Sequence, residues 1–169
     1  MNSYANNTKL KEGYKQLFSN YKFSYFVTLT YPFFGNSEEA AMADLGKEVY
    51  FVNCKIFGRN HHKEKNALYS KSKNKGISLI AALDRNTSSG LHWHLLIQNI
   101  DIPEHRRDKF ENKNAIEHLI TETWSNKVVV GGRQTDFQPV YYKEGIDEYI
   151  ADKVWISDEA IKLDWFKAL

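Results

Sequence analysis

A pair of short apolar runs separated by a turn limits the possible folds of this chain more than any other feature. The runs are Ile77–Asp84, ISLIAALD, and Leu91–Gln98, LHWHLLIQ, and RNTSSG lies between them. Their composition favours strands, and the polar segment with its glycine favours a turn, so an antiparallel hairpin is predicted. Successive side chains of a strand point to opposite faces. One face of the second run therefore carries large apolar residues that need burial: Leu91, Trp93, Leu95 and Ile97.

Other segments predict further strands and several helices. Phe23–Tyr31, which is rich in β-branched and aromatic residues and is followed by Pro32, is predicted to be a strand, as is Thr135–Tyr142. Helices are predicted at Ser37–Phe57, Pro103–Trp124 and Glu144–Trp155, with a weak one at Lys9–Asn20 and a helical tail at Asp158–Leu169. This order indicates an α+β fold, with helices packed on a largely antiparallel sheet.

The two longest predicted helices have signals at their ends. Ser37 can cap the first helix, and Gly58 is suited to end it. Pro103 fits the first turn of the second helix. The expected core positions of that second helix are Phe110, Ile116, Leu119, Ile120 and Trp124.

Length and composition narrow the class of protein. A chain of 169 residues is expected to form one domain, residues 1–169, with a core of adequate size. Its single cysteine, Cys54, excludes an internal disulfide and a CxxC metal site, which fits a reducing compartment. The sequence has no long apolar run and its N-terminus lacks a secretory signal, so a cytoplasmic protein without a membrane partner is expected.

Basic residues gather in one segment, although the net charge is only +2. Arg59–Lys75 contains six lysine or arginine residues and one acid, Glu64, and lacks apolar periodicity, so it is predicted to be an exposed loop. It is either a solvated loop or an arm that contacts the phosphates of nucleic acid. With Arg133 in the GGR turn, the candidate DNA contacts are Arg59, Lys63, Lys65, Lys71, Lys73, Lys75 and Arg133.

Two histidines occupy alternate positions of the second run. His92 and His94 share the face opposite Trp93, with imidazoles expected about 7 Å apart along the strand. If the hairpin pairs Asp84 with His92, the carboxylate joins both imidazoles, and the three side chains can hold one Mn²⁺ or Mg²⁺, with Zn²⁺ left open. The plainer alternatives are two surface histidines and an aspartate that stabilises the turn.

A tyrosine and a lysine lie one turn apart in the predicted helix EGIDEYIADKVW. Tyr149 and Lys153 fall on one stripe of that helix, where the ammonium group favours ionisation of the phenol. A phenolate is a competent nucleophile. Alternatively, Tyr149 simply packs, because the chain contains ten tyrosines.

Three stretches together resemble the HUH endonuclease superfamily, in particular its single-tyrosine rolling-circle replication initiators. FVTLTYP, starting at Phe26, resembles the first motif of these proteins, LHWHLL the second and EYIADK the third. The resemblance extends from Phe23 to Val154. It implies an RRM-related central antiparallel sheet of about five strands with helices on one face.

The resemblance also implies roles for individual residues. His92 and His94 correspond to the ligands of the divalent ion, and Asp84 stands where these initiators often carry a glutamate or a similar ligand. Tyr149 corresponds to the nucleophile, with Tyr141 and Tyr142 as rival tyrosines. The lysine of the family often follows the tyrosine by three residues, but Asp152 is found there and Lys153 comes one position later.

The implied activity is nicking of single-stranded or hairpin origin DNA, leaving a 5′-phosphotyrosine and a free 3′-OH that can later rejoin strands. The sequence has no GxxxxGK[ST] motif, so a helicase domain is not expected in this chain. Either a host helicase would serve, or the chain is one domain of a longer protein. A single-tyrosine transposase or a relaxase of the same superfamily is an alternative, although a relaxase usually has a third histidine in place of Asp84. A non-enzymatic RRM-like module that binds single-stranded nucleic acid is a further alternative.

Overall fold

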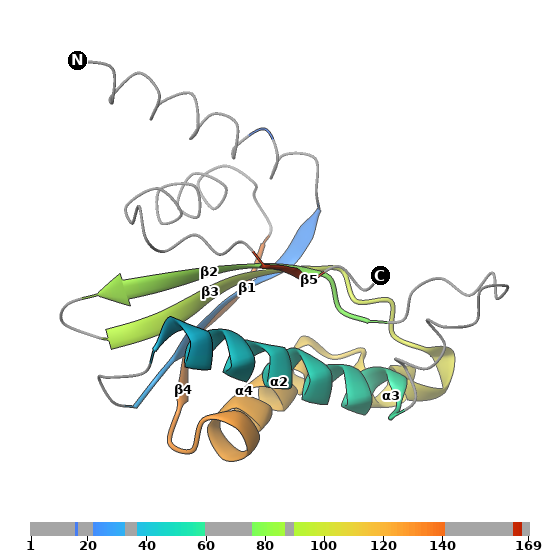
Figure 1. Cartoon of the computed structure of the whole chain (residues 1–169). Helices are drawn as coiled ribbons and strands as arrows, with labels where there is room; N and C mark the ends of the chain where they lie inside the picture. Colours follow the sequence, from blue (N-terminus) through green and yellow to red (C-terminus); the bar gives the residue numbers. More distant parts are fainter. Residues whose placement is uncertain are drawn as a thin grey trace, which may run out of the picture.

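The computed structural model describes Gln16 and residues 22–32, 37–59, 76–86, 90–140 and 164–166 (Figure 1). The strands are β1 (Phe23–Thr30), β2 (Leu79–Asn86), β3 (Gly90–Gln98), β4 (Arg133–Pro139) and the three-residue β5 (Asp164–Phe166). The helical elements are α2 (Glu38–Phe57), the 3₁₀ turn η2 (Glu104–Arg106), α3 (Arg107–Phe110), α4 (Lys113–Thr123) and the π-helical turn η3 (Trp124–Val128).

The strands form one antiparallel sheet. Its four longer strands follow the order β4-β1-β3-β2, and the short β5 pairs with the outer edge of β2. Helices α2 and α4 lie on one side of this sheet (Figure 1). The predicted α+β class, the antiparallel sheet and the β2–β3 hairpin are confirmed.

The core fills the space between the sheet and these helices. It contains the alternate residues of β3 that were expected to be buried, Leu91, Trp93, Leu95 and Ile97. The predicted core positions of the second helical region, Phe110, Ile116, Leu119, Ile120 and Trp124, are buried there as well. Both sets follow from apolar periodicity, because each face of a strand or helix repeats at a fixed spacing.

Helix α2 begins and ends as its sequence predicts. The Ser37 hydroxyl accepts a hydrogen bond from the backbone N–H of Ala40 at 3.2 Å, which satisfies one of the N–H groups that lack a partner in the first turn. Gly58 ends the helix with a φ of 97°, a conformation that disfavours residues with a Cβ. Its N–H donates to the carbonyl of Cys54.

The prediction of one continuous helix over Pro103–Trp124 is wrong. This region folds as η2, α3 and α4, and the side chain of Asn112 accepts a hydrogen bond from the N–H of Asn114 at 2.9 Å to cap α4 anew. Asparagine competes with helical hydrogen bonds through its side chain, so it favours a new start over continuation.

Trp124 connects the helical layer to β1. Its indole Nε1–H donates to the carbonyl of Thr30 at 3.0 Å, and its ring packs edge-on against Tyr31. Gly132 lies so close that a Cβ there would be 2.7 Å from Trp124 Nε1, so this approach requires glycine. This contact fixes the end of β1 that lies beside the two histidines.

The predicted helical tail is wrong at Asp164–Phe166, which pairs as β5 with Leu79–Ala81. An edge strand exposes backbone N–H and C=O groups, and a short extended segment satisfies them. The predicted strand Thr135–Tyr142 is β4, which begins earlier and ends at Pro139. The predicted helix Glu144–Trp155 lies outside the described residues, and of Lys9–Asn20 only Gln16 is described, in helical conformation.

None of the helices in the described ranges combines the length and the apolar character that crossing a bilayer requires.

Candidate metal centre

Strand register brings three potential ligands together. Asp84 of β2 lies directly opposite His92 of β3, the pairing on which the metal hypothesis depended. His92 and His94 are two residues apart on one strand, so both point to the face that Asp84 also occupies. A shift of the hairpin by one residue would have sent the carboxylate to the other face.

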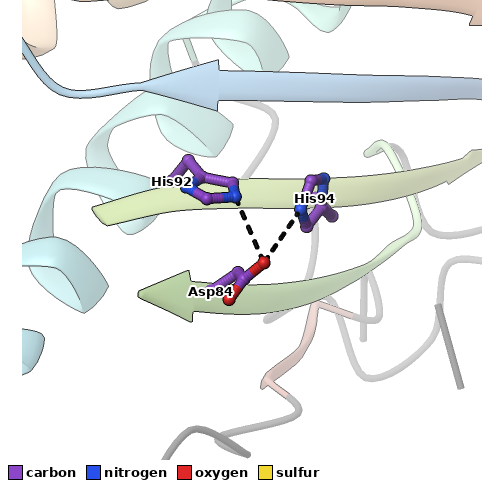
Figure 2. Close-up of side chains that lie close together, drawn as sticks. All are labelled: Asp84, His92 and His94. Carbon is purple, nitrogen blue, oxygen red and sulfur yellow. Dashed lines mark ion pairs between the residues drawn. The ribbon is translucent and has the colours of Figure 1, made fainter. Parts of the chain in front are cut away.

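The three side chains converge at their tips (Figure 2). Asp84 Oδ2 is 3.2 Å from His92 Nε2 and 3.6 Å from His94 Nε2. One ligand atom from each residue lies within 4.8 Å of the others, close enough for all three to bind a single metal ion. The imidazole centroids are only 4.8 Å apart, because the rings turn toward each other, and the expected spacing of about 7 Å is too long.

The outward nitrogen of each imidazole has its own contact. His92 Nδ1 lies 3.2 Å from the carbonyl oxygen of Gly90. A carbonyl can only accept, so this nitrogen carries the proton, and a neutral His92 presents the lone pair of Nε2 to Asp84. His94 Nδ1 lies 3.1 Å from the hydroxyl of Thr28 on β1. Such partners orient metal-binding imidazoles and fix which nitrogen faces the ion.

This arrangement requires a proton or a cation between the Asp84 carboxylate and the imidazole nitrogens that face it. A lone pair of neutral His92 and a carboxylate oxygen at 3.2 Å repel each other unless a proton or a cation lies between them. A proton on Nε2 of either imidazole would give a hydrogen bond to Asp84, which is an ion pair if that imidazole is doubly protonated. A divalent ion would satisfy all three groups at once, and two imidazoles with one carboxylate leave coordination positions for water or substrate. Nitrogen and oxygen donors of this kind do not fix the identity of the metal.

The centre is largely shielded from solvent. The side chains of Asp84, His92 and His94 are 16%, 10% and 4% exposed. The ring of Phe26 on β1 stacks against His94 with a centroid distance of 5.8 Å. Charges in such a low-dielectric environment interact more strongly than on an open surface. The more exposed Asp84 and His92 mark the end of the centre that lies nearer Gly90.

Strand pairing extends the row of polar residues to the edge of the sheet. Thr30 of β1 lies between His92 and Arg133 of β4, and its hydroxyl donates to the Arg133 carbonyl at 3.1 Å. Directly paired residues of a sheet project to the same face, so Arg133 belongs to the face of the candidate metal centre. Two interstrand spacings place its backbone about 10 Å from that of His92.

Sequence reasoning missed Thr28 as the partner of His94. Thr28 and Thr30 alternate in FVTLTYP in the same way that the two histidines alternate in LHWHLL. That shared alternation was a usable signal, because strands that pair antiparallel bring matching faces together.

Of the other predicted site residues, the structure describes Arg59 and Arg133, and both are exposed. Arg59 comes directly after Gly58, the residue that caps α2. The predicted nucleophile Tyr149 and its neighbour Lys153 lie outside the described residues, as do Lys63, Lys65, Lys71, Lys73 and Lys75.

The tyrosines within the described residues have other roles. Tyr31 is buried, donates to the carbonyl of Ala41 and has a pKa raised by desolvation, so it is a poor source of phenolate. Tyr25 packs against Phe137. Tyr50 lies on α2, on the helical side of the sheet.

Comparison with protein-family models, with curated proteins and with solved structures finds no match to this chain. The function therefore has to be inferred from the geometry of the candidate metal centre and from the sequence motifs.

Proposed function

We propose that this chain is a metal-dependent endonuclease that nicks single-stranded origin DNA through a tyrosine nucleophile, as replication initiators of the HUH type do. The observation that carries the proposal is the convergence of Asp84, His92 and His94 on one point of an antiparallel sheet. The order of the acid, the paired histidines and a later tyrosine with lysine supports it.

The chain's own residues would divide the work as follows. Asp84, His92 and His94 hold Mn²⁺ or Mg²⁺, while Thr28 and the Gly90 carbonyl keep the imidazoles oriented. A divalent ion bound there would withdraw charge from the scissile phosphate and orient it for in-line attack. Arg133, on the same face two strands from His92, would contact the phosphate backbone of the bound strand.

The chemical step is a transesterification. The phenolic oxygen of Tyr149 forms a bond to phosphorus after losing its proton, and the bond from phosphorus to the 3′ oxygen breaks. The 3′ oxygen of the upstream fragment leaves with the electron pair and takes up a proton, which gives the free 3′-OH, while the downstream fragment stays attached to Tyr149 through its 5′ phosphate. Lys153 would favour the phenolate. The phosphotyrosine remains a diester, so a later 3′-OH can reverse the reaction.

A single-tyrosine transposase or a relaxase would use the same centre, and the acid at position 84 favours an initiator over a relaxase. A non-enzymatic stacking platform has less support. Such a platform needs exposed aromatic rings on the sheet face. Phe26, which stacks on His94, is only 7% exposed.

The metal part of the proposal is tested by calorimetric titration with Mn²⁺. The wild-type protein should bind about one equivalent, and His92→Ala should weaken binding by at least tenfold because it removes a ligand. His118→Ala is the matched control, because that side chain is 80% exposed on α4. Equal binding by the wild type and a His92→Ala/His94→Ala variant would remove the metal centre.

The nuclease part is tested by trapping adducts from a randomised pool of single-stranded and hairpin oligonucleotides with Mn²⁺. The wild type should give an adduct that survives boiling in detergent, and sequencing the attached DNA identifies the nick site. Tyr149→Phe should abolish the adduct with little change in stability, while Tyr141→Phe and Tyr142→Phe should retain it. Cleavage without an adduct would identify water as the nucleophile, and absence of both cleavage and adduct would reject the nuclease.

A further inference from the structure

A concave site separate from the candidate metal centre is formed by the helical elements. It is a pocket of about 540 Å³ between the C-terminal half of α2 and the end of α4, with η2 at its rim. That volume is typical of sites for small molecules. The residues that matter for its chemistry are Tyr50, Phe51, Lys55, Arg59, Arg106 and Lys127.

The lining of this pocket is strongly basic. Among the described residues of the lining, Lys55, Arg59, Arg106 and Lys127 carry positive charge, and Glu122 carries a carboxylate. Glu122 also faces His118 at 4.0 Å. Cations gathered in a concave surface raise the local positive potential and attract anions. Arg106 donates a long hydrogen bond to the Lys55 carbonyl at 3.5 Å, and its guanidinium group has further N–H donors that can bind a phosphate.

Aromatic rings stand beside these cations. Tyr50 is 47% exposed and Phe51 37% exposed, with their ring centroids 5.6 Å apart. In the part of the chain that the structure describes, they and Val130 are the exposed large hydrophobic residues, so two of these three line one pocket. Exposed aromatic surface inside a pocket usually marks a place where a ligand packs.

We propose that this pocket binds a nucleotide, with its base stacked on Tyr50 or Phe51 and its phosphates on Arg59, Arg106 and Lys127. A base offers a flat π surface and a phosphate offers the negative charge, so one ligand satisfies both halves of the lining. The nucleotide is either free or the end of a single strand. This inference does not depend on the metal centre, because no residue of that centre lines the pocket.

The test is equilibrium binding of ATP, inorganic pyrophosphate and a dT₁₀ oligonucleotide in EDTA, measured by calorimetry. EDTA keeps divalent ions from the candidate metal centre, and all titrations are repeated with the His92→Ala/His94→Ala variant. ATP should bind the wild type and this variant equally. Binding should weaken as salt rises, because the lining cations contact phosphate. Weaker ATP binding to dT₁₀-saturated protein would identify the strand end as the ligand, and ATP binding without dT₁₀ binding would identify the free nucleotide.

Paired substitutions separate the two halves of the site. Lys127→Gln combined with Arg59→Gln should weaken the binding of both ATP and pyrophosphate by roughly tenfold or more. Lys47→Gln, which lies on α2 but outside the pocket, should change the binding of neither ligand. Tyr50→Ala should weaken ATP binding by roughly tenfold and leave pyrophosphate binding unchanged, because pyrophosphate has no base to stack on the ring. Thermal unfolding of each variant confirms that it is folded.

Three outcomes would overturn the proposal. One is that neither ATP nor dT₁₀ binds the wild type at millimolar concentration. A second is that Lys47→Gln weakens binding as much as the pocket variants do. A third is that binding disappears with the His92→Ala/His94→Ala variant, which would place the ligand at the metal centre instead.

Discussion

Replacing Glu48 with glutamine should stabilise the protein, by an amount that grows with pH. Glu48 lies in α2 with 3% of its surface exposed, and neither carboxyl oxygen has a hydrogen-bond partner within the described part of the chain. Burial raises the pKa of its carboxyl group from the ordinary value of 4.5 to about 9. Desolvation disfavours the charged form, so Glu48 stays protonated in the folded protein at neutral pH.

The sign and size follow from this difference. The stability associated with neutral Glu48 is fully present below pH 4.5, where the unfolded chain also carries the proton, and it is lost as the pH rises toward about 9. At pH 7, ionisation of the unfolded chain favours unfolding by about 3 kcal/mol, because each pH unit above 4.5 contributes about 1.4 kcal/mol. Glutamine resembles the protonated side chain and does not titrate, so the substitution removes this pH-dependent contribution to unfolding.

The assay is urea unfolding of the wild type and Glu48→Gln at several pH values from 5 to 9. The difference in the free energy of unfolding should rise by about 1.4 kcal/mol per pH unit across this range. Glu111→Gln, at an exposed position, is the matched control and should show no such slope. A difference that stays flat from pH 5 to 9 would refute the buried neutral carboxyl group.

Other predictions concern the metal centre, the close approach of Gly132 and the basic loop. Thr28→Val should weaken Mn²⁺ binding about tenfold or more in a calorimetric titration, because it removes the hydroxyl beside His94 Nδ1. Thr30→Val on the same strand should leave Mn²⁺ binding unchanged, and equal effects of the two substitutions would argue against orientation of His94 by Thr28. Gly132→Ala should lower the free energy of unfolding in urea by about 1–3 kcal/mol, because its Cβ would crowd Trp124. Gly46→Ala in the open middle of α2 should raise the free energy of unfolding by about 0.5–1 kcal/mol. An unchanged unfolding midpoint for Gly132→Ala would contradict the close contact. Neutralising Lys71, Lys73 and Lys75 should weaken binding of single-stranded DNA and flatten its salt dependence, and an unchanged slope would show that this segment does not contact DNA.

Local pattern was sufficient to predict the parts of the structure that depend on neighbouring residues. The alternation in LHWHLL determined which side chains of β3 enter the core and which form the candidate metal centre. The short hairpin made the pairing of Asp84 with His92 one of few available registers, and the structure shows that this register is the one formed. Ser37 and Gly58 bounded α2 because caps act through adjacent backbone groups.

Other features depend on contacts between distant residues or on a balance of small energies. The contact of Thr28 with His94 joins positions 66 residues apart. The alternation in FVTLTYP indicates the face on which Thr28 lies, but it does not specify which strand lies beside β3. The new helix start at Asn112 depends on a capping free energy of about 1 kcal/mol. The spacing of apolar residues does not reveal a difference of that size. Burial of Glu48 is a result of packing, since an isolated amphipathic helix would present a glutamate to solvent.

The hairpin register has a consequence for how sequences with this centre can diverge. Deleting one residue within β3 would exchange the two faces of the strand and bring Trp93 to the place of an imidazole, so both the ligands and the core would be lost together. The connection between β2 and β3 can change in length only where the same strand residues stay paired. Homologues of this chain should therefore vary in loop length but keep Asp84, His92 and His94 on the same face of the sheet. A search for distant homologues should fix the two strand segments and leave the spacing between them free.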